Sequence, residues 1–317
     1  MPVKLTPELG RCLALKAELE HIGRAFDAAG IDFIVLKGLP LAVRLTGRID
    51  GRGRRIRDND LLVRRKDVRE AVHVLERLGY SLLPDVTLES QLDVNFEVEM
   101  HRRAEAGLSL CAEVHWAPFP PLLYPTDEDL VWARTEPVLV GELRVETLDK
   151  TLTLLQLASH FVQHAASVDW VLRDLAMAWN LWGAQIEPEA LKRLATQTGL
   201  THVLAFSLSA AEDRGWLTRR PPALGSSRAR LLRVLLPTSR LGPPQAQPTL
   251  RRSLELSILA PARQVPTWLW SRIAPPRSLI AGRFGVSEPS VGLRHYAIRT
   301  LRAATRAAKR WRRPADS

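Results

Sequence analysis

The sequence predicts an α+β protein in which a domain with a small mixed sheet is followed by a helical domain. Up to residue 147, short β-rich runs alternate with amphipathic helical segments, and the segments after it carry apolar residues at i, i+3 and i+4. The chain has 317 residues, of which 46% are hydrophobic and 25% charged, and this length fits two globular domains. We therefore expect a first domain over residues 1–147, a helical domain over 148–217 and a Pro-rich basic region over 218–317.

The first domain is predicted to begin with an amphipathic helix over residues 7–29, whose apolar residues recur at helical spacing until Gly30 ends it. Residues 33–38 (FIVLKG) predict a short strand that enters a turn, and residues 39–46 predict a brief helix. The Gly- and Arg-rich residues 47–57 have no apolar period, which indicates a loop.

Further strands and a helix complete this domain. Residues 59–63 (NDLLV) predict a strand, and residues 66–80 (KDVREAVHVLERLGY) predict a helix with one apolar face. Apolar and polar residues alternate in NFEVEMHR (95–102), and after a turn the chain returns as LSLCAEVHW (108–116), which predicts a hairpin. A Pro-rich stretch and a small β-like piece over 136–148 follow.

Four helices are predicted in the helical domain, over residues 148–166, 169–183, 188–199 and 201–216. Prolines and glycines interrupt residues 221–266, which leaves room for two short helices at most. The chain then ends in a basic amphipathic helix over about 291–313. Such a helix can contact nucleic acid or an anionic membrane surface, or it can dock on its own domain. Its few aromatic residues argue against stacking on single-stranded bases, and we favour docking.

The excess of positive charge is concentrated at the end of the chain. Residues 1–217 contain 25 Lys and Arg against 31 Asp and Glu, whereas residues 218–317 contain 20 against 3. An anionic partner is therefore expected at the C-terminal region. A general preference for Arg, which supplies 38 of the 45 basic residues, explains the same excess equally well.

The two cysteines, Cys12 and Cys111, are too few for a disulfide framework and lack metal-site spacing, so we expect a reducing cytoplasm. The N-terminus has no continuous apolar core, which argues against a signal peptide. No apolar run approaches the roughly 20 residues that are needed to cross a bilayer.

The most informative motif is IRDNDLLV (56–63), in which Asp58 and Asp60 stand two residues apart at the start of an apolar strand. Their side chains should leave the same face of the strand and repel each other unless a cation lies between them. Mg²⁺ prefers such carboxylate oxygens together with substrate phosphates. Taken alone, the pair fits a polar strand edge or a turn better than a metal site.

A third acidic residue changes this interpretation. Glu113 lies inside the apolar strand 108–116, where a carboxylate without a partner is costly to bury. If this strand neighbours residues 59–63, Glu113 completes a cage of three carboxylates. Two metal ions in such a cage can clamp the attacking and leaving oxygens of a phosphoryl displacement. An edge position that faces solvent, or a pair with an Arg, is the alternative.

Taken together, DFIVLKG (32–38), RDNDLLV (57–63), a helix ending LGY (78–80) and AEVHW (112–116) resemble the family of uncharacterised nucleotidyltransferases on the polymerase-β-like fold. The stretch HFVQHAASVDWVLRDLAMAW (160–179) is similar to the helical region of that family. The resemblance covers roughly residues 10–215. It implies a polymerase-β-like nucleotidyltransferase domain in which the catalytic and metal-binding carboxylates are Asp58, Asp60 and Glu113, with Glu113 as the base toward the acceptor hydroxyl.

Lys37 and Gly38 match the Lys-Gly turn of this family. The wider superfamily has Gly-Ser at its turn, closer to the carboxylate pair, and uses the turn to hold nucleotide phosphate. A bare Gly still lets backbone N–H groups approach an anion. The resemblance therefore implies that Lys37 and Gly38 contact the nucleotide. Asn59 stands where an apolar residue is commoner, and it should face away from the metals.

Five arginines precede or adjoin the carboxylate pair. Arg guanidinium groups suit the oxygens of a triphosphate, so Arg57 and then Arg54 are the predicted nucleotide contacts. The alternative for both is a solvated loop, or Arg side chains that offset the carboxylate charges. For Arg48, Arg52 and Arg55 we favour the solvated loop.

His160 and His164 are spaced i, i+4 and should share one face of a helix. HFVQH lacks the Glu of the zinc-protease motif, so the two residues are expected to pack between the domains and hydrogen-bond Asp174, or to line an acceptor pocket. His115 either hydrogen-bonds to the metal ligands and orients them, or it only fills space in the fold. The predicted acceptor pocket thus contains His115, His160, His164 and Asp174.

The predicted reaction moves a nucleoside monophosphate from a nucleoside triphosphate such as ATP to an acceptor hydroxyl, with Mg²⁺ or Mn²⁺ as cofactor. The acceptor is a small molecule, a peptide, a protein or RNA. Two alternatives stay open: a non-catalytic module that binds a nucleotide or a partner on the same scaffold, and a phosphotransferase that passes on the γ-phosphate.

Overall fold

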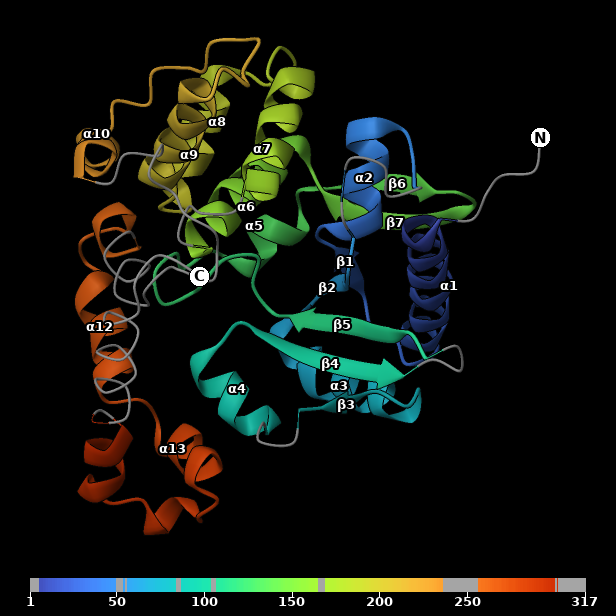
Figure 1. The fold of residues 1–317 in the computed structure, drawn as a ribbon, viewed down its shortest axis with the longest axis vertical. Coiled ribbons are helices and arrows are strands. Elements are labelled where there is room, and N and C mark those ends of the chain that lie inside the picture. Colours follow the sequence, from blue (N-terminus) through green and yellow to red (C-terminus); the bar gives the residue numbers. More distant parts are fainter. Residues whose placement is uncertain are drawn as a thin grey trace, which may run out of the picture.

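The computed structural model describes residues 6–49, 54, 56–83, 87–103, 107–164, 169–235, 256–299 and 301. A small mixed sheet lies beside a region of packed helices (Figure 1). The predicted α+β class, a mixed-sheet domain followed by a helical region, is confirmed.

The sheet has five strands in the order β1-β2-β5-β4-β3. The pairing of β2 with β5 is parallel, and the other pairings are antiparallel. This part of the chain contains, in order, α1 (Pro7–Ala28), β1 (Phe33–Val35), α2 (Gly38–Thr46), β2 (Asn59–Val63), η1 (Arg65–Asp67), α3 (Val68–Arg77), β3 (Ser81–Leu82), α4 (Leu88–Val94), β4 (Glu97–Arg103) and β5 (Ser109–His115).

The two faces of the sheet pack on different hydrophobic cores. Successive side chains of a strand point to opposite faces. Leu61 of β2 joins a core with α1 and α3, whereas Leu62 joins a second core with the helical region. Asn59 lies on the first of these faces, where its Nδ2 donates to the carbonyl of Leu15 in α1 at 3.2 Å. By the same alternation, Asp60 lies on the face turned toward the helical region.

The rest of the described chain is mainly helical. It contains, in order, α5 (Glu128–Trp132), β6 (Thr135–Val140), β7 (Leu143–Leu148), α6 (Lys150–Gln163), α7 (Asp169–Trp182), α8 (Pro188–Gln197), α9 (Thr201–Asp213), α10 (Ser227–Leu235), α12 (Val265–Ile273), α13 (Arg277–Phe284) and η4 (Glu288–Ser290). Helices α6 to α9 correspond to the four predicted helices. Their core also includes Ile34 and Leu62 of the sheet, so the helical region packs on β1 and β2. The domain boundary at residue 147 stays a prediction.

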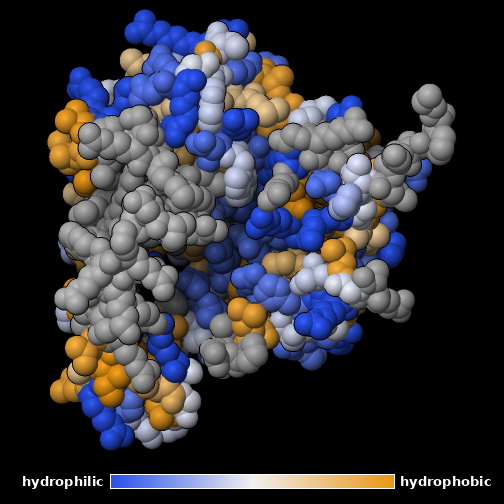
Figure 2. Space-filling model, viewed as in Figure 1, coloured by the Kyte–Doolittle hydropathy of each residue, from blue (hydrophilic) through white to orange (hydrophobic). Residues whose placement is uncertain are grey.

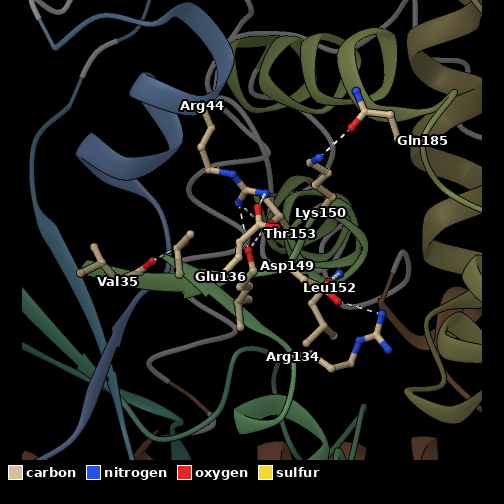
Figure 3. Close-up of polar contacts among 11 residues, drawn as sticks. Val35, Arg44, Arg134, Glu136, Asp149, Lys150, Leu152, Thr153 and Gln185 are labelled. Carbon is tan, nitrogen blue, oxygen red and sulfur yellow. Dashed lines mark hydrogen bonds and ion pairs between the residues drawn. The ribbon is translucent and has the colours of Figure 1, made fainter. Parts of the chain in front are cut away.

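Arg44, in the last turn of α2, ties the first part of the chain to the helical region (Figure 3). Its Nη1 donates to the carbonyl of Leu148 at 2.9 Å and to Oγ1 of Thr153 at 3.0 Å. Its Nη2 pairs with Glu136, and the guanidinium carbon lies 4.4 Å from the ring centroid of Trp182. These contacts hold α2 against β6, α6 and α7. We call Arg44, Glu136, Thr153 and Trp182 the Arg44 cluster.

Several short elements have no clear signal in the sequence. Elements β3, α4, α12 and α13 were not predicted, and the strand predicted over residues 33–38 ends at Val35. Helix α13 packs against α4, so the C-terminal region returns to the first part of the chain (Figure 1). Among the described residues, none of the helices combines the length and the apolar character that a membrane span requires.

The predicted terminal helix over 291–313 is described only in its first part, which is helical from residue 293. Tyr296 Oη donates to the carbonyl of Pro275 at 3.0 Å, and Arg299 Nη2 donates to the carbonyl of Arg272 at 2.8 Å. This first part is therefore docked on its own chain. Residues 302–313 lie outside the described residues, and an anionic partner for them stays a prediction.

Candidate active site

The parallel pairing of β2 with β5 places Asp60 directly opposite Glu113. His115 follows two positions further along β5 and shares the face of Glu113, because alternate residues of a strand point to the same side. This face is turned toward the helical region. Figure 2 shows mainly hydrophilic residues in the hollow between the helical region and β2.

Four charged or polar side chains meet at this point. Lys37 Nζ lies 2.8 Å from Asp60 Oδ1, and His115 Nε2 lies 3.3 Å from the same oxygen. His115 Nε2 also lies 3.4 Å from Glu113 Oε2. The Asp60 side chain is only 1% exposed, so its charge depends on these partners rather than on solvent. We call Lys37, Asp60, Glu113 and His115 the Asp60 cluster.

The pKa values within the Asp60 cluster are pushed apart. Burial opposes the charge on Asp60, but Lys37 and a hydrogen bond with His115 hold the pKa of Asp60 well below its usual range. Burial raises the pKa of Glu113 to about 7; the hydrogen bond with His115 lowers it, and the charge of Asp60 raises it further. Burial lowers the pKa of His115, but hydrogen bonds to Asp60 and Glu113 outweigh this and raise it to about 10. Near neutral pH, Glu113 is therefore the one of these three that exchanges its proton readily.

The residues present fit a divalent cation. Ligand atoms of Asp60, Glu113 and His115 lie within 4.8 Å of one another. Oδ2 of Asp60 is buried and, within the described part of the chain, has no hydrogen-bond partner. A buried carboxylate oxygen in that state is costly unless a cation or donor satisfies it. The carboxylate oxygens suit Mg²⁺ or Mn²⁺, and the imidazole of His115 offers a further ligand atom.

Asp58 lies immediately before β2 and is partly buried. Burial and then the charge of Asp60 raise its pKa, whereas Lys37, Arg54 and His115 lower it. Asp58 therefore lies within the electrostatic reach of the Asp60 cluster. It does not belong to the group of three whose ligand atoms lie within 4.8 Å among the described residues.

The turn from β1 into α2 depends on Gly38. Its φ is +62°, and a Cβ at this position would lie 3.3 Å from the carbonyl oxygen of Asp58. A side chain is therefore disfavoured both by the backbone conformation and by the close approach of the loop before β2. Arg54 closes this turn: its Nη1 donates to the carbonyl of Gly38 at 2.8 Å, and its Nε pairs with Asp174 Oδ2 of α7 at 2.8 Å.

The other predicted nucleotide contacts are placed differently. Arg57 is exposed beside Asp58, and Arg48 is exposed beyond the end of α2. Arg52 and Arg55 lie outside the described residues. Of the arginines between α2 and β2 that the structure describes, Arg54 is the one held between the Gly38 turn and the helical region.

The predicted acceptor-pocket residues have different direct partners, although His160 and Asp174 both lie within the electrostatic reach of Lys37. His115 belongs to the Asp60 cluster, and Asp174 forms its ion pair with Arg54. The ring of His160 lies 4.5 Å from that of His164 and 6.0 Å from that of Trp170, between centroids. Burial and then the charge of Lys37 lower the pKa of His160, so that its ring is neutral.

Acidic residues of β4 were missed by the sequence analysis. Glu97 stands opposite His115 in the β4–β5 pairing, with its Oε2 3.3 Å from Nδ1 of His115. Further along the same face, Glu99, His101 and Cys111 offer ligand atoms within 4.8 Å of one another. The alternation in NFEVEMHR contained the signal, because it places Glu97, Glu99 and His101 on one face, next to the polar face of β5.

The chain was compared with protein families, curated proteins and solved structures. The chain matches the family model of uncharacterised nucleotidyltransferases over residues 9–214, most of its length. None of the curated proteins matches it. Among solved structures it is similar to an antigenic nucleotidyltransferase-like protein from Paracoccidioides brasiliensis, with 14% identity, a TM-score of 0.39, and coverage of 63% of this chain and 88% of that one. On the extent of the family match, the chain belongs to the uncharacterised nucleotidyltransferases.

Proposed function

We propose that the protein moves a nucleoside monophosphate from a nucleoside triphosphate to an acceptor hydroxyl, with Mg²⁺ or Mn²⁺ as cofactor. The observation that carries the proposal is the register that sets Asp60, two residues after Asp58, opposite Glu113. Acidic side chains crowded in this way around a buried, unpartnered carboxylate oxygen favour a divalent cation over an empty polar site.

In this proposal Asp58, Asp60 and Glu113 hold the metal. The bound metal would neutralise the charge that develops on the phosphoryl oxygens. Lys37 keeps Asp60 ionised and positioned, and the N–H groups at the start of α2 face the phosphates beside Gly38. Positioning and charge neutralisation supply most of the rate enhancement for this class of transfer.

Glu113 is the proposed base. The acceptor oxygen attacks the α-phosphorus, the bond from that phosphorus to the bridging oxygen of the β-phosphate breaks, and pyrophosphate leaves. The acceptor proton passes to a carboxylate oxygen of Glu113, which the strand register sets beside Asp60. A location in the cytoplasm, where triphosphates are abundant, belongs to the same proposal.

The test is release of pyrophosphate from each nucleoside triphosphate by the full chain with Mg²⁺ and a deproteinised cell extract as the source of acceptors. We expect Asp60→Asn and Asp58→Asn to lower the rate about 10³-fold, because metal binding supplies several kcal/mol of transition-state stabilisation. Asp129→Asn is the matched control, since Asp129 is an exposed partner of Arg64 on α5. Undiminished rates in the two site variants would refute the assignment.

The nature of the products separates this reaction from its two alternatives. A phosphotransferase would release nucleoside diphosphate in place of pyrophosphate. A non-catalytic module would bind nucleotide in calorimetry without any turnover, and its affinity would be insensitive to Mg²⁺. No observation in the structure favours either alternative over nucleotidyl transfer.

A further inference from the structure

A pocket of about 390 Å³ lies on the helical side of the Asp60 cluster, between α7, the loop that carries Arg54, and the segment after α9. Its lining combines indole rings, guanidinium groups and a thioether: Trp170, Trp216, Arg54, Arg173 and Met177. Trp170 is 48% exposed and Met177 38% exposed. Exposed large apolar side chains beside a polar site mark a place for a flat, partly apolar ligand.

The aromatic wall has a fixed geometry. The guanidinium carbon of Arg173 lies 5.0 Å from the ring centroid of Trp216, and the neutral ring of His160 backs Trp170 with centroids 6.0 Å apart. Trp170 is thus packed against His160 and still has about half of its surface exposed, at 48%. An indole in that position is a stacking platform for a planar ring.

Two directional polar side chains of the pocket, Asn180 and Asp174, are already engaged. Asn180 Nδ2 donates to the carbonyl of Trp216 at 2.9 Å, and its Oδ1 accepts from the backbone N–H of Thr218 at 2.9 Å. Asp174 is ion-paired with Arg54 at 2.8 Å. The described lining therefore offers few groups that could read the hydrogen-bonding edge of a base, and recognition must come mainly from stacking and from positive charge.

Arg54 joins the pocket to the proposed phosphate site. It lines the pocket and also donates to the carbonyl of Gly38, at the turn where the phosphates are proposed to lie. Asp174, the ion-pair partner of Arg54, also lines the pocket. The base and the phosphates of one nucleotide could therefore be bound on the two sides of Arg54.

We propose that this pocket binds the base of the nucleoside triphosphate, with Trp170 as the stacking platform, and that purines are preferred because they stack over a larger area. The inference rests on the proposed function, since it names the part of the substrate that enters this pocket. It predicts a broad choice among purines, because the base is held by its face and not by its edge.

Two probes separate the base from the phosphates: α,β-methylene ATP, which cannot release pyrophosphate, and inorganic tripolyphosphate. We expect Trp170→Ala in the full chain to weaken α,β-methylene ATP at least about fivefold, the lower end of the stacking contribution, and to leave tripolyphosphate unchanged. Trp170→Phe should recover most of the affinity. Trp270→Ala, which removes a 67% exposed indole from α12, is the matched control.

Binding of α,β-methylene CTP, the cytidine counterpart of α,β-methylene ATP, provides the second measurement. We expect the wild-type chain to bind it more weakly than α,β-methylene ATP and Trp170→Ala to remove most of that difference. Equal binding of α,β-methylene ATP by wild type and Trp170→Ala would overturn the inference and leave the proposed function standing. If Trp170→Ala then also lost turnover, the pocket would be assigned to the acceptor instead of the base. If the wild-type chain binds neither probe with Mg²⁺, the proposed function and this inference fall together.

Discussion

The two ends of α2 carry two partly buried cations with different surroundings. Lys37 precedes the first turn and belongs to the Asp60 cluster, whereas Arg44 lies in the last turn and belongs to the Arg44 cluster. Arg44 faces one carboxylate, one hydroxyl, one carbonyl and an indole face. Lys37 feels the charges of Asp60, Glu113 and Asp58 together. Similar cations on one helix therefore take part in a balanced contact and in a crowded acidic one.

The difference separates a structural cluster from a functional one. In the Arg44 cluster the charges balance and the donors have partners, so the contact stabilises the fold without any ligand. In the Asp60 cluster the carboxylates of Asp60 and Glu113 lie close together beside Lys37 and His115, and a buried oxygen of Asp60 has no hydrogen-bond partner in the described residues. Such an arrangement costs stability in the free protein, and a bound cation relieves that cost.

The largest expected effect on stability comes from breaking the Arg44 cluster. Arg44→Met should lower the free energy of unfolding by about 3 kcal/mol, because it leaves Glu136, Thr153 and the carbonyl of Leu148 without their donor. The value is at the low end for a buried pair, since a third of the Glu136 side chain is exposed. Urea unfolding followed by Trp fluorescence measures it.

Arg134→Met is the matched control for that change. Arg134 pairs with Asp149 at 2.8 Å, but both side chains are partly exposed, so the expected loss is under about 1 kcal/mol. Equal losses of unfolding free energy in the two variants would show that the Arg44 cluster stabilises the fold no more than an exposed ion pair does. Folded Arg44→Met protein should keep its activity in the pyrophosphate assay.

Metal binding should stabilise the fold through the Asp60 cluster. At 100 times the dissociation constant, Mg²⁺ or Mn²⁺ should add about 2.7 kcal/mol, because the ion binds the folded chain and not the unfolded one. Thermal unfolding with the metal or with a chelator measures the gain. Arg44→Met should keep it and Asp60→Asn should lose it; a gain that survives in Asp60→Asn would place the metal elsewhere.

Removing one acidic charge should stabilise the metal-free protein while it impairs the reaction. Glu113→Gln should raise the free energy of unfolding by about 2 kcal/mol at pH 8 in the presence of a chelator, because the raised pKa corresponds to about 3 kcal/mol and solvent at the 22% exposed side chain screens part of it. Burial raises the pKa of Glu113 from 4.5 to about 7, so its ionised form is disfavoured in the fold. The wild-type protein should therefore be as stable as Glu113→Gln below pH 4.5. Its free energy of unfolding should fall below that of the variant between pH 4.5 and 7, and the difference should be complete above pH 7. A difference in stability between the two proteins that becomes smaller as pH rises would contradict the raised pKa of Glu113.

The smallest effect concerns the edge of the region shown in Figure 3. Lys150 Nζ donates to Gln185 Oε1 at 2.6 Å in an exposed position (Figure 3). Gln185→Ala should change the free energy of unfolding by less than about 0.5 kcal/mol, because solvent replaces an exposed hydrogen bond. The same urea titration measures this change. A larger loss would show that the contact between Lys150 and Gln185 contributes to the stability of the Arg44 cluster.

The helices and strands with regular apolar patterns were predictable, and the short ones were not. The pattern of NDLLV gave β2 its bounds, and the period of 66–80 gave α3 its apolar face. Strand β3 has two residues and α4 has seven, too few for a period to stand out from composition. These elements form because β4 and α13 pack against them, which no local pattern records.

In the candidate site, the types of side chain were evident but their partners were not. The acidic pair and Glu113 were conspicuous in apolar surroundings, and Asn59 was expected to point away from them. The partners of Asp60 are Lys37 and His115, which come from a turn and from another strand. Arg54 and Asp174 stand 120 positions apart, and only the packing of α7 on the sheet makes them an ion pair.

Local backbone geometry explains what the sequence determined by itself. A strand alternates its side chains, so Asn59 points away from Asp60, and a left-handed turn favours glycine, so Gly38 marks the entry to α2. The parallel register of β2 on β5, the contacts of Arg44 and the walls of the Trp170 pocket were decided by the tertiary structure alone. Each of them joins segments far apart in the chain, and their alignment depends on hydrogen-bond register and packing, not on the order of neighbouring residues.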